Sequence, residues 1–251
     1  MASALALACS SSTSTQTPLK DAGPPSNHAL KFNGTTDYAQ AGTANFVASN
    51  SPQTISFWVS YLPEDAGKGT DDFLSLQRDI QSGLHIGIKN GALAAWRQYE
   101  SPRDGPLVSS ALPSENWHHI AYVLDRPDGG YLNTLYVDGK VTDTTNVPPN
   151  NVTPEIFLLG SSAEWTNHFA GYLDEIRVWK VARTAAEVQE EMRGAVHAKE
   201  PGLIVYFNCN EVLDGGLLLD NSGNGNNALL GGGDVKYMPT LVPSTRPQPS
   251  Q

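Results

Sequence analysis

Aromatic side chains next to polar segments are the residues of this chain best suited to bind a ligand. They stand on two segments, 96–105 and 161–167. The candidate ligand-binding residues are Trp96, Arg97, Tyr99, Arg103, Glu164, Trp165 and Asn167. Aromatic faces stack on sugar rings, amides and carboxylates bond to hydroxyl groups, and arginine pairs with acidic ligands. These residue types predict a carbohydrate site; the alternative is that the aromatic rings only close one end of the fold.

Carboxylates at a catalytic spacing are not evident. Glycoside hydrolysis uses two carboxyl groups held roughly 5–10 Å apart. Asp174 and Glu175 are adjacent on an expected strand, where neighbouring side chains point to opposite faces. We therefore expect Asp174 to be structural and Glu175 to be exposed to solvent. No Ser/His/Asp or Cys/His set is evident either, so the sequence does not predict an enzyme.

The two cysteines stand in different surroundings. Cys209 ends the β-prone run 203–209, which favours a small buried side chain. Cys9 lies in the leader, so no disulfide inside the domain is expected.

Charge and composition restrict the class of protein. Sixteen Lys and Arg against 26 Asp and Glu give a net charge of −10, which disfavours nucleic acid and polybasic membrane contacts. The 23 Gly and 17 Pro among 251 residues suit short strands joined by turns. No apolar run reaches the length of a bilayer span. The composition predicts one β-rich domain with tails.

The elements that must position the candidate site are predicted to be β-strands. Apolar and polar residues alternate over 55–60, and further short β-prone runs follow as far as residue 179. Asn90-Gly91 and Asp138-Gly139 are two-residue hairpin signals. This spacing predicts an all-β fold of two antiparallel sheets packed face to face.

A single helix is predicted near 184–193. Thr184 and Glu187 have the spacing of a capping box. Val188 and Met192 are four residues apart and are expected to face the sheets, and Gly194 follows as a stop.

Six motifs in order resemble the bacterial laminin-G-like domains of the concanavalin A-like jelly-roll superfamily. They are 29–38 (ALKFNGTTDY), 55–59 (ISFWV), 117–123 with 135–139 (WHHIAYV and LYVDG), 171–179 with 182–187 (GYLDEIRVW and ARTAAE), 201–206 (PGLIVY) and 220–225 (DNSGNG). The resemblance implies a jelly-roll domain over 29–240. Residues 241–251 are Pro-rich and are expected to be a disordered tail.

The same resemblance implies a structural calcium ion. Domains of this family often hold Ca²⁺ between the first strand and the late Gly-x-x-Asp-Glu strand. Carried over, the ligands would be Asn33, the carbonyl of Gly34, and Asp174. The family usually has Asp where this chain has Asn33, and the loss of one charge lowers the expected affinity. The Glu-x-Asp-x-x-Glu string of jelly-roll glucanases is missing.

The first 28 residues resemble a truncated bacterial lipoprotein signal followed by a tether. Cys9 closes the run LALAC, and the stretch 10–25 is rich in Ser, Thr and Pro. The resemblance implies a lipid on Cys9, the only expected membrane contact, and an outer-membrane or cell-surface location.

Two functions follow from fold, leader and aromatic loops together. The first is a non-catalytic carbohydrate-binding module at a bacterial cell surface, with a polysaccharide or glycan as partner. The second is a protein-interaction, adhesion or assembly domain of the same fold, which would present a broad apolar patch to a cell-surface protein. A hydrolase or lyase is the least favoured reading.

Overall fold

The computed structural model describes residues 27–62, 70–98, 105–112, 116–149, 151–165, 167–194 and 199–248. Several predictions concern other residues. Cys9, nearly all of the leader and tether, Tyr99 and Arg103 lie outside the described residues.

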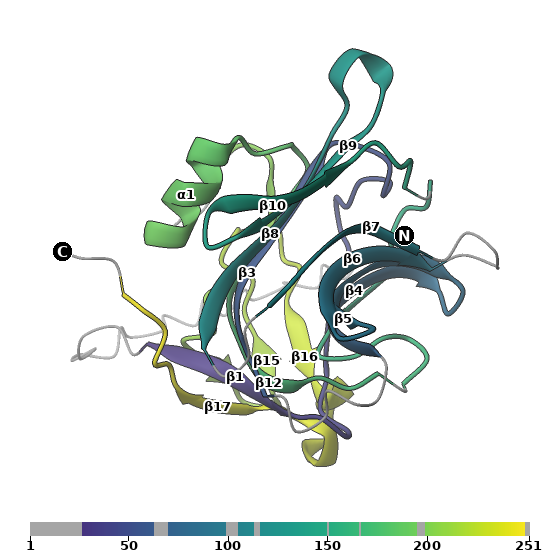
Figure 1. Ribbon diagram of the computed structural model, residues 1–251. Coiled ribbons are helices and arrows are strands. Elements are labelled where there is room, and N and C mark those ends of the chain that lie inside the picture. Colours follow the sequence, from purple (N-terminus) through teal and green to yellow (C-terminus); the bar gives the residue numbers. More distant parts are fainter. Residues whose placement is uncertain are drawn as a thin grey trace, which may run out of the picture.

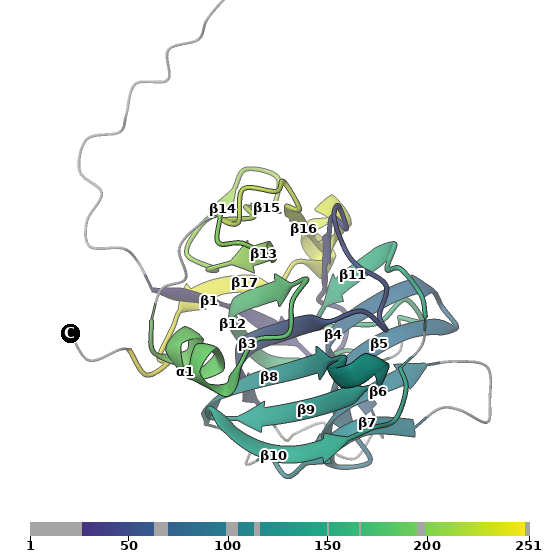
Figure 2. The ribbon, with the colours of Figure 1, turned by 90° about the horizontal axis from the view of Figure 1, so that it is seen from above.

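Two antiparallel sheets face each other, as predicted (Figures 1 and 2). Sheet A has the order β10-β9-β8-β3-β12-β1-β17, with β13 also paired to β12, and sheet B has the order β14-β15-β16-β2-β11-β4-β5-β6-β7. The strands are β1 His28–Asn33, β2 Ala39–Ala41, β3 Gln53–Tyr61, β4 Thr70–Asp79, β5 Ser82–Lys89, β6 Ala92–Gln98, β7 Gly105–Ser110, β8 Trp117–Asp125, β9 Leu132–Val137, β10 Lys140–Thr145, β11 Ile156–Leu159, β12 Ala170–Trp179, β13 Leu203–Phe207, β14 Val212–Leu213, β15 Leu217–Leu218, β16 Ala228–Leu230 and β17 Thr240–Pro243. Short 3-10 turns are η2 Pro127–Gly129, η3 Gly231–Gly233 and η4 Val235–Tyr237.

The core lies between the sheets, where alternate residues of each strand meet. Phe57 and Ile120 from sheet A, with Phe73 and Phe157 from sheet B, are fully buried there. Each such side chain stabilises the fold by about 1.5–3 kcal/mol through removal of apolar surface from water. Cys209 is also in this core, as a free thiol whose pKa is raised well above its usual value by burial.

The two hairpin predictions are confirmed. Asn90 and Gly91 connect β5 to β6 with φ of 54° and 77°, and Asp138 and Gly139 connect β9 to β10 with φ of 50° and 71°. Positive φ at both central residues is the geometry of a type I′ turn.

The predicted helix is α1 (Ala185–Arg193), and both hydrogen bonds of its capping box are present. Figure 1 shows α1 outside sheet A, on the side away from β4–β7. Its buried Val188 packs on Ala121, Val123 and Tyr136, which β8 and β9 direct outward. Glu191 is buried as well, and Ser56 Oγ and Arg183 Nε compensate its carboxylate by donating hydrogen bonds at 2.6 and 2.8 Å.

The C-terminal tail prediction is wrong for residues 241–248. β17 pairs with β1 in antiparallel register, with Ala29 opposite Val242, and so extends sheet A beyond residue 240. Arg246 then folds over the outer face of the sheet and is buried. Pro243 ends the strand at its outer edge, a position where proline is compatible with a sheet.

The expectation that Asp174 and Glu175 point apart, with Glu175 in solvent, is also wrong. Glu175 has a φ of 54° at a register shift in β12, which breaks the alternation of side chains. Arg246 therefore reaches both carboxylates, with Nε 2.9 Å from Asp174 Oδ2 and Nη2 3.4 Å from Glu175 Oε1. Arg177 pairs with Glu175 from the other side. Both carboxylates belong to a buried ion-pair network under the C-terminal segment.

Two connections between the sheets lie side by side and position the candidate site. One runs from β1 to β2 and the other from β11 to β12. Asn33 is opposite Ala170 in sheet A, and Ala39 is opposite Leu159 in sheet B. Both loops therefore cross at the same end of the sandwich.

Within the described ranges, no helix has the length and apolar character needed to cross a membrane.

Candidate functional site

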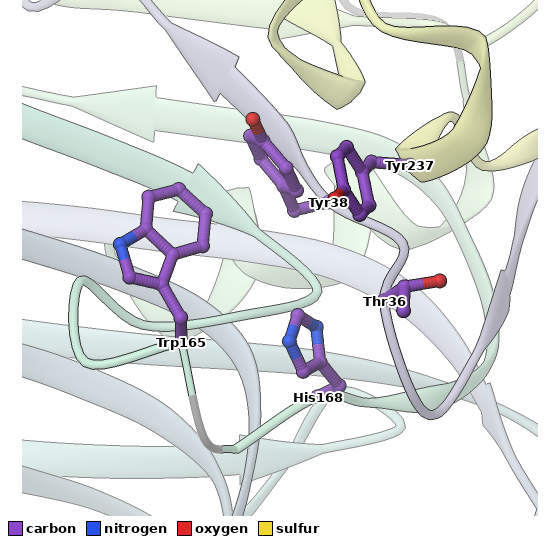
Figure 3. Close-up of a pocket in the computed structure, with 5 residues that line it drawn as sticks. All are labelled: Thr36, Tyr38, Trp165, His168 and Tyr237. Carbon is purple, nitrogen blue, oxygen red and sulfur yellow. The ribbon is translucent and has the colours of Figure 1, made fainter.

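An aromatic cavity of about 300 Å³ lies where these two loops meet the C-terminal turn η4. The described residues that line it are Thr36, Tyr38, Trp165, His168 and Tyr237. Figure 3 shows their side chains around one common space. The Tyr38 and Trp165 ring centroids are 4.6 Å apart at an interplanar angle of 68°, and those of Tyr38 and Tyr237 are 6.3 Å apart at 36°.

The loop 160–169 holds Trp165 at the cavity. Gly160 opens the loop with a φ of 75°, and a Cβ there would lie 2.3 Å from the Phe32 ring, so only glycine fits. Phe169 N–H closes the loop on Gly160 O at 3.0 Å. Inside the loop, Ala163 N–H donates to Gln77 Oε1 at 2.8 Å. The loop is thus fixed to sheet B on the side of its outer face.

Trp165 itself is held outward by its backbone. Its N–H donates to Ser162 O at 2.9 Å, and its φ is 57°, which is rare for a bulky side chain. The indole is 48% exposed. Residues with strained backbone cluster at functional sites, so Trp165 is a candidate binding residue.

The loop 33–38 brings Tyr38 to the same place. The Asn33 side-chain oxygen accepts from the N–H groups of Thr35, Thr36 and Asp37 at 2.9, 2.9 and 3.2 Å, which fixes the turn. Tyr38 N–H then donates to Tyr237 O at 3.1 Å, so the two tyrosines are joined through the backbone.

The described lining of this cavity contains no Lys, Arg, Asp or Glu side chain. Burial raises the pKa of Tyr38, so its hydroxyl stays protonated. Burial also raises the pKa of the nearby Asp37 carboxyl, although hydrogen bonds from Asn33 oppose the shift. Aromatic faces with hydroxyl and imidazole groups between them suit a polyhydroxylated ring, which has apolar C–H faces and polar edges.

The seven predicted ligand-binding residues do not form one group. Trp165 lines the cavity, and Glu164 and Asn167 are on the same loop but are not among its described lining residues. Glu164 Oε1 accepts from Gln98 Nε2, and Asn167 O accepts from Asp72 N–H at 3.2 Å.

Trp96 and Arg97 are part of a different region, β6. Trp96 is 3% exposed and stacks on His85, with ring centroids 5.2 Å apart at 16°. The Lys89 ammonium covers the same ring at 5.2 Å. Its indole is therefore packed against the outer face of sheet B and offers no open surface for stacking. Arg97 donates from Nη1 to Pro148 O.

The three predicted calcium ligands are not brought together. Asp174 is four residues beyond Ala170, the partner of Asn33, which separates them by about 13 Å along β12. Asn33 binds its own turn, and Asp174 accepts from Arg246 Nε and Ser244 Oγ at 2.9 and 3.1 Å. The described residues hold no group of three or more His, Cys, Asp or Glu side chains arranged for a metal ion.

Sequence reasoning missed Thr36, Tyr38, His168 and Tyr237. Tyr38 ends the first of the six motifs, and Tyr237 lies 199 positions further on, so no local pattern joins them. The turn residues Asn33 and Gly34 in front of Tyr38 were a usable signal, because binding residues are often on loops that a rigid scaffold positions.

A two-sheet sandwich with an aromatic cavity between its inter-sheet loops is a lectin-like jelly roll. The chain belongs to the concanavalin A-like lectin/glucanases superfamily, whose laminin G family model matches residues 33–189. This confirms the laminin-G-like resemblance of the six motifs, whereas the lipoprotein-type leader stays a prediction.

Three known proteins show the range of similar chains. Mouse pappalysin-1 is 33% identical over 112 residues, 41% of this chain and 6% of that protein. A candidate carbohydrate-binding protein from Bacteroides ovatus has a TM-score of 0.68 at 20% identity, over 90% of this chain and 62% of that one. Domain 4 of an extracellular arabinanase from Geobacillus stearothermophilus, solved with arabinotriose, has a TM-score of 0.53 at 22% identity, over 65% and 75%. This chain thus spans a small part of pappalysin-1 and less than two thirds of the Bacteroides chain.

Proposed function

We propose that this chain is a non-catalytic carbohydrate-binding domain that takes a glycan in the cavity lined by Tyr38, Trp165 and Tyr237. The observation that carries the proposal is the convergence of three aromatic rings on one space of about 300 Å³, with the indole of Trp165 half exposed beside it. Rings brought together favour a sugar ligand over a flat protein partner, which would meet a broader apolar patch.

The residues that line the cavity support a binding role rather than a hydrolytic one. None of the five described lining residues carries a carboxyl group. Hydrolysis of a glycosidic bond uses two of them in most families. The Bacteroides protein is described as a candidate carbohydrate-binding protein, and the arabinanase domain was solved with arabinotriose bound. Both similarities agree with the proposal.

Binding to a glycan array, followed by titration of the best ligand, tests the proposal. We expect Trp165→Ala to weaken binding about tenfold, the loss of about 1.4 kcal/mol of stacking and buried area. The matched control is Val141→Ala on β10, because Val141 is 53% exposed, is not among the described lining residues of the cavity, and lies at the opposite end of sheet A from β17. The titration is run with and without calcium, because calcium dependence stays a prediction. An array without hits, from a protein shown to be folded, would favour a protein partner.

We also propose that the domain is carried on a cell surface by a lipid on Cys9. The support is the sequence around Cys9 and the Ser/Thr/Pro-rich stretch that follows it. The test is the intact mass of the protein isolated from membranes of its source cells, in which we expect a diacylglycerol on Cys9. A mature protein that retains residues 1–8 with an unmodified thiol contradicts it.

A further inference from the structure

A second aromatic cavity, of about 320 Å³, lies on the outer face of sheet A. Its lining includes Lys31, Ser60, Trp117, Tyr172 and Thr245 and shares no described residue with the first cavity. The register of the sheet explains why these residues meet. Lys31 is opposite Tyr172, Tyr172 is opposite Ser60, and Ser60 is opposite Trp117, so β1, β12, β3 and β8 place them in one row.

The row lines a slot in which the paired rings of Trp117 and Tyr172 form one wall beside the small residue Ser60. Neighbouring strands are about 4.8 Å apart, so Tyr172 and Trp117 stand two strands apart with Ser60 as the floor between them. Their ring centroids are 6.1 Å apart at 45°. Trp117 is held in place by its Nε1–H, which donates to Thr245 Oγ1 at 3.0 Å. The aromatic wall is therefore ordered before any ligand arrives.

Neighbouring parts of this face are covered by other segments of the chain. The helix α1 packs on Ala121 and Val123 of β8, and the Arg246 guanidinium lies 5.7 Å from the ring of Trp58 on β3. Figure 2 shows α1 near β3 and β8, with β17 along β1. The slot lies on a part of the outer face that neither α1 nor Arg246 covers.

Lys31 supplies a positive charge at one side of the slot. Its side chain is exposed, and its ammonium lies 5.9 Å from the centroid of the Tyr172 ring. The ion pairs found among the described residues do not include Lys31. The Lys31 ammonium beside the aromatic rings can pair with an anionic group of a ligand, although the net charge of the chain is −10.

We propose that this slot is a second carbohydrate site, selective for acidic sugars. A hexuronic acid residue would place one ring face on the Trp117–Tyr172 pair, whose rings are in contact with each other, and its carboxylate on the Lys31 ammonium. The inference goes beyond the proposed function, because the site is on a different face, has different residues and takes a different class of sugar.

Titration of the full chain with oligogalacturonate tests this site, with the indole N–H signal of Trp117 as the readout. We expect that signal to shift at millimolar ligand. Lys31→Gln should weaken binding about three- to fivefold, as expected for one partly exposed ion pair. The carboxyl-reduced form of the same oligosaccharide should lose a similar factor. Lys140→Gln, an exposed lysine of β10, is the matched control and should bind as the unaltered chain does.

Two results would overturn the second site. One is an unshifted Trp117 indole at millimolar oligogalacturonate, and the other is equal binding by Lys31→Gln and Lys140→Gln. Trp165→Ala separates the two cavities, since acidic-sugar binding should survive in it. If binding is lost in Trp165→Ala but kept in Lys31→Gln, the acidic sugar binds in the first cavity, and only the second-site proposal fails.

Discussion

Arg246 and Asp174 show how single residues far apart in sequence decide the electrostatics of the outer face. Asp174 is fully buried, and burial raises the pKa of its carboxyl to about 6, with Glu175 adding to the shift and Arg246 opposing it. Nothing local in the sequence indicates this environment. The strand alternation that should separate Asp174 from Glu175 fails at one bulged residue, and the covering arginine comes from a segment that reads as a disordered tail.

The raised pKa of Asp174 predicts a pH-dependent stability. Between an unfolded value near 3.8 and a folded value of about 6, the folded state binds more protons, so this group's stabilisation is fully present below 3.8 and is lost as pH rises through 6. In Asp174→Asn, which has no such proton, this part of the pH dependence should vanish. The free energy of unfolding of each protein is measured in urea at about pH 4 and at about pH 8. From the lower to the higher pH, the variant should gain up to about 3 kcal/mol of stability relative to the unaltered protein. Parallel curves for the two proteins would contradict the assignment.

At the scale of elements, the sequence was sufficient to predict those elements whose conformation depends on neighbouring residues only. The hairpin at Asn90-Gly91 and the capping box of Thr184 were predicted because turn conformation and helix capping involve neighbouring residues only. β17 was missed because it is only four residues long and ends in a proline, which is unusual in a strand. Its partner, β1, lies more than 200 residues earlier in the chain. Trp96 was misplaced for a similar reason, since only the cross-strand partner His85 shows that its ring is covered.

The pairing of β17 predicts that the C-terminal segment is required for stability. Removal of residues 240–251 takes away the outer partner of β1 and leaves Asp174 and Glu175 without Arg246. Loss of one member of a buried ion pair costs about 3 kcal/mol or more, which corresponds to a fall in melting temperature of about 10 °C for a domain of this size.

Removal of residues 249–251 alone is the matched control, because it leaves β17 and Arg246 in place. Its melting temperature should equal that of the full chain. Equal melting temperatures for both truncations would show that β17 and Arg246 contribute no stability.

At the scale of the whole molecule, the fold was predictable and the cavity was not. Strand periodicity, turns and six ordered motifs gave two antiparallel sheets and the superfamily. The cavity depends on which loops meet at one end of the sandwich, and it joins Tyr38, Trp165 and Tyr237 from three distant segments. Of these, Trp165 alone was predicted, because it is the one whose own loop has the composition of a sugar site.

The measurement that tests the central claim most directly is a titration of the ¹⁵N-labelled chain with the best neutral glycan from the array, followed through the indole N–H signals of its 5 tryptophans. If the glycan binds between Tyr38, Trp165 and Tyr237, the Trp165 signal shifts with saturation, while the buried Trp96 and Trp179 signals stay in place. Saturable binding that leaves the Trp165 signal unmoved would contradict the account.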